Sequence, residues 1–184
     1  RSPAAPADTG GRDGIDVLCE GLRFPMGLAL SRTGELFATD NQGNYNPFNE
    51  LNHLRRGAHF GFINKLERRG SERPELAEPA VDIPHPWTRS VNGICFLDTP
   101  EGLRQSGKEN RFGPFEGHLL GCEYDTRRLV RMSVEVVEGQ YQGAAYPFSS
   151  EPPEGVPGLL GPVVCAVAHD GSVWVGGMRD SGWG

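Results

Sequence analysis

A five-residue polar run, 40–44, directly follows the apolar stretch 36–39 and is the first candidate for chemistry. It reads Asp40-Asn41-Gln42-Gly43-Asn44. Carboxylate, amide and carbonyl oxygens are the ligands that Ca²⁺ prefers, and glycine lets backbone carbonyls turn toward a ligand where a side chain would block them. The same residue types also stabilise an ordinary turn without any ligand. Both a binding site and a turn therefore remain open for this segment.

Other titratable residues favour structural roles. His59 and His85 stand among polar and aromatic residues, where a histidine is more often a hydrogen-bonded structural group than an acid or base. We expect four charged residues in one turn to be solvated: Glu123, Asp125, Arg127 and Arg128. Arg179, Asp180 and Trp183 follow a strand-like run, a position where binding residues concentrate.

The four cysteines are Cys19, Cys95, Cys122 and Cys165, and they show no C-x-x-C pairing. A zinc site is therefore not expected. Each cysteine lies in an apolar run, which favours four small buried side chains. A Cys95–Cys122 disulfide stays open as an alternative, provided that their two strands pair in an oxidising compartment.

The elements that must position these residues are strands. Short apolar runs alternate with turn residues, and the chain holds 26 Gly and 15 Pro, so the pattern predicts an all-β fold. Segments 28–40 and 166–176 both consist of a strand, a tight polar turn with Gly, and a second strand. A third copy is stretched: 93–97 and 118–122 are separated by the polar insertion 98–116, which we expect to be a surface loop.

Further strands follow each inner hairpin, at 51–55, 129–134 and 140–146. Four antiparallel strands per repeat is the blade of a β-propeller. Gly34 and Gly171 lie 137 positions apart, which corresponds to two repeats of about 68 residues with insertions in loops. We therefore expect a propeller fragment with two to three four-stranded blades over 15–184, preceded by a linker or truncated blade edge over 1–14.

Charge and hydropathy exclude some partners. The net charge of −6, the pI near 5.4 and the lack of a basic run argue against nucleic acid and anionic membrane. No apolar stretch reaches the roughly 18 residues of a membrane span.

The order of motifs from 36 to 62 resembles the quinoprotein glucose/sorbosone dehydrogenases, a family of six-bladed β-propellers. The elements that match are the strand, the acidic residue, Gln42-Gly43, Glu50-Leu51-Asn52, and the later pattern Gly-x-x-aromatic-Gly-aromatic. The similarity continues in register through 90–94, 115–119 and 170–175, and it covers about residues 20 to 180.

The resemblance implies a cofactor site. Gln42, with Asn41 beside it, would contact pyrroloquinoline quinone (PQQ), and the carbonyls of Gly43 and Asn44 would hold Ca²⁺. Asn44 stands where relatives commonly have Pro, a change that keeps the carbonyl. Glu50 matches a carboxylate associated with a second, structural calcium. The family's general-base histidine lies in an earlier blade, outside this chain.

One departure concerns the cations that clamp the acidic quinone in relatives. The matching stretches, 121–125 and 161–165, contain no lysine or arginine. Charge-assisted hydrogen bonds of this kind contribute about 1.5–3 kcal/mol each. Arg127, Arg128 or Arg179 would have to compensate from nearby loops.

Three functions remain open at this stage. The first is a propeller that oxidises a sugar or sugar aldehyde with a bound quinone and Ca²⁺ and passes the electrons to a cytochrome or another acceptor. The second is a non-catalytic propeller that binds carbohydrate or protein. The third is a metal-dependent lactonase, to which Asp40 and Asn92 would contribute. The resemblance implies a periplasmic or secreted protein.

Overall fold

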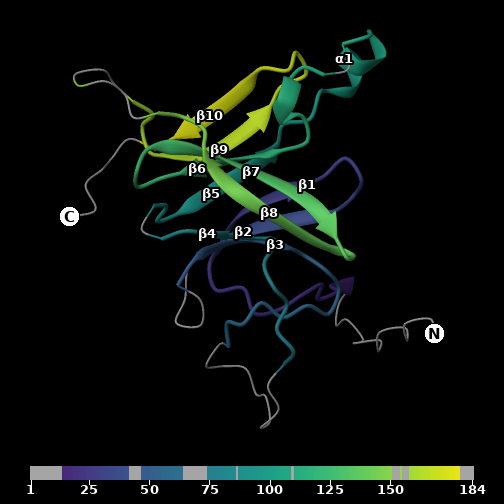
Figure 1. Ribbon diagram of the computed structural model, residues 1–184, viewed down its shortest axis with the longest axis vertical. Coiled ribbons are helices and arrows are strands. Elements are labelled where there is room, and N and C mark those ends of the chain that lie inside the picture. The colour runs from purple at the N-terminus through teal and green to yellow at the C-terminus, as the bar shows by residue number, and fades with distance from the viewer. Residues whose placement is uncertain are drawn as a thin grey trace.

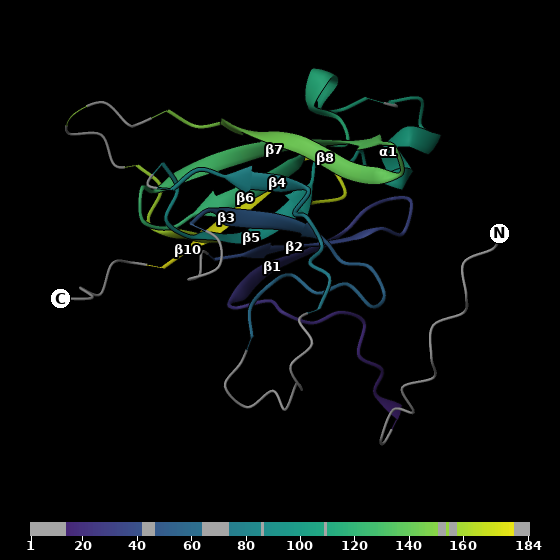
Figure 2. The same ribbon diagram turned by 60° about the horizontal axis from the view of Figure 1, so that its bottom comes forward.

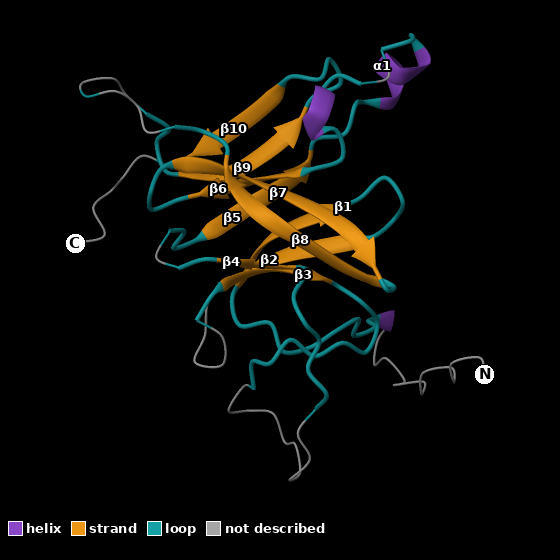
Figure 3. Ribbon diagram, in the orientation of Figure 1, coloured by secondary structure: helices purple, strands orange, loops and turns teal. Residues whose placement is uncertain are grey.

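The computed structural model describes residues 14–41, 47–63, 74–85, 87–108, 110–150, 154 and 158–178. Strands dominate these residues, and the two helical elements whose bounds are described are α1 (Glu101–Gln105) and the 3₁₀ turn η2 (Gly113–Phe115) (Figure 3). Both helical segments lie in the insertion that was predicted as a surface loop. The all-β prediction is confirmed.

The first sheet has four antiparallel strands in the order β1-β2-β3-β4. Their bounds are β1 (Pro25–Leu30), β2 (Leu36–Asp40), β3 (Asn49–His53) and β4 (Val81–Ile83). The hairpin predicted over 28–40 is confirmed, and Gly34 takes the positive φ of +90° in its turn. The sequence reasoning missed β4, which has only three residues.

The second sheet repeats this order with β5-β6-β7-β8. Its strands are β5 (Val91–Phe96), β6 (Leu119–Glu123), β7 (Arg128–Val137) and β8 (Gln140–Pro147). The third sheet contains β9 (Pro162–Val167) and β10 (Val173–Gly177), the second predicted strand–turn–strand unit. The described chain therefore contains two four-stranded blades and two strands of a third, as predicted.

The first strands of the three sheets lie side by side without hydrogen-bonding into one sheet, so the sheets follow one another around an arc (Figures 1 and 2). Their backbones approach closely at two glycines. A Cβ on Gly27 would lie 2.2 Å from the carbonyl oxygen of Asn92, and a Cβ on Gly93 would lie 2.7 Å from that of Val163. Only glycine allows such an approach, and the repetition of the contact supports an arc of a β-propeller.

Two apolar cores fill the spaces between the sheets. The larger core lies between the first and second sheets, and its fully buried side chains include Phe37, Leu51, Ile83, Leu119 and Met132. The smaller core lies between the second and third sheets and contains Leu97, Leu120, Cys122 and Cys165.

All four cysteines are free thiols. Cys122 and Cys165 are buried as predicted, whereas Cys19 and Cys95 are half-buried. The Cys95–Cys122 disulfide considered from sequence is not formed. The register explains this, because Cys95 pairs with Leu120 and so lies diagonal to Cys122 on the neighbouring strand.

Candidate functional site

Loops from neighbouring blades meet at one end of the strands. In the first sheet Pro25, which opens β1, pairs with Asp40, which ends β2. In the second sheet Val91 and Glu123 form the equivalent pair. The loop entering each inner strand and the loop leaving each second strand therefore share one end of the arc. We call residues 23–24, 40–41, 89–92, 123–127 and 160–161 the loop end.

Asp40 anchors the loop end in the first blade. Its side chain is buried and accepts hydrogen bonds from the backbone N–H groups of Arg23 (2.7 Å), Phe24 (2.6 Å) and Asn41 (2.9 Å). The amides of residues 23 and 24 precede β1 and so lack a partner in the strand ladder. The Asp40 carboxyl supplies one, which is the turn role left open by the sequence.

Glu123 has the same position in the second blade. It is fully buried and accepts hydrogen bonds from the N–H groups of Arg89 (2.9 Å), Ser90 (3.1 Å) and Thr126 (2.6 Å), and from the Thr126 hydroxyl. The prediction that Glu123 is a solvated turn charge is wrong, because these donors satisfy its oxygens inside the protein. Asp125 and Arg127 in the same turn are exposed, as predicted.

A repeat in the sequence signals this shared role. Residues 23–27 read Arg-Phe-Pro-Met-Gly and residues 89–93 read Arg-Ser-Val-Asn-Gly, so each copy has Arg at its start and Gly at its end. Each copy precedes the acid that ends the second strand of its own sheet. An alignment of the two copies would have predicted that Glu123 has the same role as Asp40.

Polar side chains connect the two blades at the loop end. The Asn41 Nδ2 group lies 3.5 Å from Ser90 Oγ, and the Ser90 hydroxyl donates to Asn92 Oδ1 at 3.0 Å. The Thr39 hydroxyl donates to the Asn92 carbonyl oxygen at 3.0 Å. Within the part of the chain that the structure describes, Asn41 Oδ1 is buried without a hydrogen-bond partner, as are Asn52 Oδ1 and His59 Nε2. An unsatisfied amide oxygen costs about 1–3 kcal/mol, so Asn41 is a candidate for contact with a ligand donor or a cation.

Among the described residues, arginines line the loop end in the first two blades but not in the third. Arg23 and Arg89 are exposed at equivalent positions, and Arg127 is exposed in the turn after β6 with a positive φ of 58°. Pro162 opens β9 as Pro25 opens β1, which places Leu160 at the position of these arginines. In the part of the chain that is described, the positive charge at the loop end therefore comes from the first two blades.

The other site residues predicted from the sequence are Gln42, Gly43, Asn44, Glu50 and Arg179. Gln42, Gly43, Asn44 and Arg179 lie outside the described residues. Glu50 is buried on β3, where it pairs across the sheet with Asp40 and Asp82 and accepts a hydrogen bond from Asn52 Nδ2 at 2.9 Å. Within the part of the chain that the structure describes, no group of three or more His, Cys, Asp or Glu side chains is arranged to hold a metal ion.

His59 has the structural role predicted for it. Its ring is buried, and Nδ1 accepts a hydrogen bond from the backbone N–H of Gly61 at 3.1 Å. It lies beside residues 20–21, where the isolated bridge between Glu20 and His59 joins the two segments.

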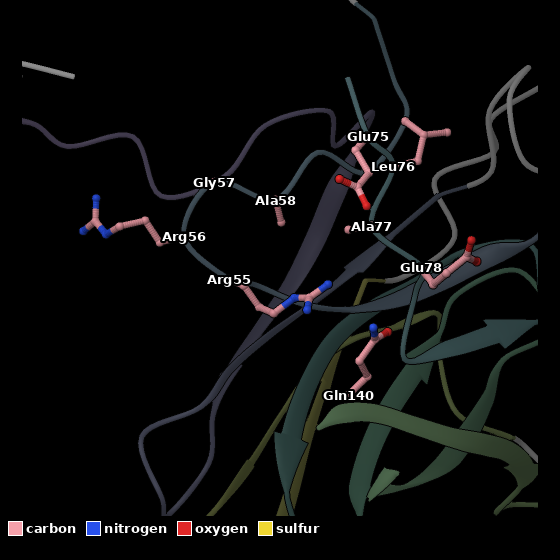
Figure 4. Close-up of a pocket in the computed structure, with 9 residues that line it drawn as sticks. All are labelled: Arg55, Arg56, Gly57, Ala58, Glu75, Leu76, Ala77, Glu78 and Gln140. Carbon is pink, nitrogen blue, oxygen red and sulfur yellow. The ribbon is translucent and has the colours of Figure 1, made fainter. Parts of the chain in front are cut away.

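Three clefts lined by described residues open at the opposite end of the strands. One cleft, of about 570 Å³, lies at the C-terminal ends of β5 and β9. Another, of about 420 Å³, lies beside residues 31–33. The third, of about 500 Å³, is formed by segments 55–58 and 75–78 together with Gln140. In it the Arg55 side chain extends toward Gln140, whereas Arg56 extends away from the hollow (Figure 4). None of these three clefts includes a residue of the loop end.

Comparison with known proteins places the fold. No protein-family model and no curated protein matches the sequence. Among solved structures, a glucose dehydrogenase-type oxidoreductase from Thermus thermophilus is 22% identical with a TM-score of 0.58, over 93% of this chain and 44% of that one. The PQQ-bound aldose sugar dehydrogenase of Streptomyces coelicolor is 20% identical with a TM-score of 0.54, over 92% and 42%. The apo aldose sugar dehydrogenase of Escherichia coli is 14% identical with a TM-score of 0.54, over 94% and 47%.

The likeness shows the fold: the chain has the architecture of part of a β-propeller of the kind found in these solved structures. It spans less than half the length of each of these solved structures. No helix in the described ranges is long and apolar enough to cross a membrane.

Proposed function

We propose that this chain forms part of a sugar dehydrogenase-like propeller whose loop end binds a PQQ-type quinone and Ca²⁺ and receives a sugar or sugar aldehyde. One observation carries the proposal. The buried, unpartnered oxygen Asn41 Oδ1 lies where two blades meet, in the fold of a dehydrogenase that has been solved with PQQ bound. In propellers the chemistry is placed in such loops on a rigid scaffold.

The residues at the loop end fit an anionic ligand with a hard cation beside it. Asn41 Oδ1 is an oxygen donor of the kind that Ca²⁺ accepts, and it directly precedes Gln42, Gly43 and Asn44, which we propose as the cofactor and calcium residues. Arg23, Arg89 and Arg127 bring positive charge to the same end. The carboxyls of Asp40 and Glu123 are turned to backbone amides.

In this proposal the residues of the chain hold the cofactor and orient the loops around it. Asp40 and Glu123 fix the loops that carry Arg23 and Arg89, and the Asn41–Ser90–Asn92 contacts keep the two blades in register. When bound, the quinone supplies the electrophile that accepts a hydride, and the metal polarises it. We propose Arg127 and Arg179 as further partners of its carboxylates.

The test is a titration of the complete gene product carrying residues 1–184 with PQQ in the presence of Ca²⁺, followed by sugar-dependent reduction of an artificial dye. We expect binding at micromolar concentration or tighter, together with dye reduction that depends on both Ca²⁺ and sugar. A folded protein that binds no quinone would overturn the proposal. That result would leave a non-catalytic propeller whose loop end recognises another ligand.

A further inference from the structure

Three of the four cysteines meet where the second and third sheets pack together. Cys95 lies on β5, Cys122 on β6 and Cys165 on β9. Cys165 is buried in the smaller core together with Cys122, and the side chain of Cys95 packs against that core. The Cys165 Sγ lies 3.5 Å from the Leu120 carbonyl oxygen and 3.7 Å from that of Gly93. Cys165 is therefore within reach of two alternative partners.

Access distinguishes the two partners. Cys95 and Cys165 both line the cleft of about 570 Å³ at the end of the strands opposite the loop end, and Asp98, Glu101 and His169 line the same cleft. Cys122 is fully buried and is not part of the cleft lining. A small molecule that enters the cleft can therefore reach Cys95 and Cys165 but not Cys122.

We propose that Cys95 and Cys165 are a redox-sensitive pair that a small-molecule disulfide converts into a disulfide bond. The two S–H bonds break, one S–S bond forms between the residues, and the S–S bond of the reagent is reduced to two thiols that carry away both protons. The new bond would connect β5 to β9, which belong to different sheets. It would thus fix the third blade to the second at the inner strands.

The surroundings of the pair set the conditions for the reaction. The hydrogen bond to Cys122, together with burial, raises the pKa of Cys165 to about 12. The hydrogen bond to Cys165 and burial likewise raise the pKa of the Cys95 thiol. Since the thiolate is the nucleophile, we expect slow oxidation at neutral pH. Both cysteines should stay reduced unless the protein is exposed to a disulfide reagent for hours.

Peptide mapping tests the proposal directly, because trypsin places every cysteine on a different peptide. Cys19 falls in 13–23, Cys95 in 90–104, Cys122 in 112–127 and Cys165 in 132–179. The reduced gene product is incubated overnight with oxidised glutathione at pH 8.5, alkylated, digested without reductant and analysed by mass spectrometry. We expect one cross-linked species, which joins 90–104 to 132–179.

Matched variants identify the partners. Cys122→Ser and Cys19→Ser should retain the cross-link, whereas Cys165→Ser should lose it. A cross-link between 112–127 and 132–179 in the unsubstituted protein would overturn the proposal, and so would the absence of any cross-link while circular dichroism shows a folded protein.

Thermal unfolding gives a second measurement that does not depend on the variants. A disulfide between residues 70 positions apart constrains the unfolded chain, so the oxidised protein should melt about 5 °C or more above the reduced one. An unchanged melting temperature would contradict a bond between β5 and β9. Neither measurement involves PQQ or sugar, so the inference stands or fails independently of the proposed function.

Discussion

The fully buried side chain of Glu123 should be the most sensitive single position at the loop end. In Glu123→Ala the backbone N–H groups of Arg89, Ser90 and Thr126 lose their acceptor, as does the Thr126 hydroxyl. Each hydrogen bond contributes about 1–1.5 kcal/mol net, and more where the acceptor is charged. Because the hydroxyl can rotate to another acceptor, we count the three amides and expect a loss of about 4 kcal/mol.

Urea unfolding followed by circular dichroism measures this loss. With a slope of about 2 kcal/mol/M, the midpoint should fall by about 2 M. Glu135→Ala is the matched control, because Glu135 is exposed on β7 of the same sheet and should change stability by less than about 0.5 kcal/mol. Equal midpoints for Glu123→Ala and Glu135→Ala would refute the anchoring role that we assign to Glu123.

Two further predictions concern packing and pH. Gly27→Ala should lower the free energy of unfolding by about 3 kcal/mol or more, because its Cβ would lie 2.2 Å from a backbone carbonyl oxygen. Gly102→Ala in α1 is the control, since its Cβ meets no atom within 4 Å and the change should be neutral or slightly stabilising. Equal unfolding midpoints for the two variants would contradict the backbone contact between β1 and β5. Burial opposes ionisation of Glu116, but hydrogen bonds from Thr99 and Phe112 and the charge of Arg32 outweigh it and hold the pKa of Glu116 below its usual 4.5. The contribution of ionised Glu116 to stability is therefore present above about pH 5 and is lost as the pH falls through the lowered pKa. Glu116→Gln should lose less stability between about pH 5 and 3 than the unsubstituted protein does. Identical acid-unfolding profiles for the two proteins would contradict this role of Glu116.

The longer strands could be predicted from the sequence, whereas the short strand β4 and the short helix α1 could not. The hairpin at 28–40 and the strand near 119–123 contain short apolar runs, and the strand near 140–147 alternates polar or small residues with aromatic ones. β4 has only Val81, Asp82 and Ile83, and its pairing with β3 is set by the fold. The helix α1 lies in a polar insertion, where a single turn gives no period to read.

The sequence drew attention to the segment that enters the loop end, but it did not predict the role of each residue there. The sequence located the run that begins at Asp40, yet the structure shows the Asp40 carboxyl turned to backbone amides. Glu123 was misjudged because a charged residue at a turn is usually solvated, and its donors come from residues 89 and 90, more than thirty positions away. The packing of Cys95 against the core that contains Cys165 was missed because Cys165 comes from the third sheet, 70 positions away in the sequence.

The central claim is that the loop end around Asn41 binds the proposed quinone and its metal. The most direct measurement is the dissociation constant for PQQ in the presence of Ca²⁺, determined by calorimetry for the complete gene product and for its Asn41→Ala variant. Gln105→Ala, at the exposed end of α1, serves as the control. The account predicts tight binding that Asn41→Ala weakens at least about tenfold, or about 1.4 kcal/mol, and that Gln105→Ala leaves unchanged. Equal affinity in all three proteins, or no binding to the folded product, would contradict it.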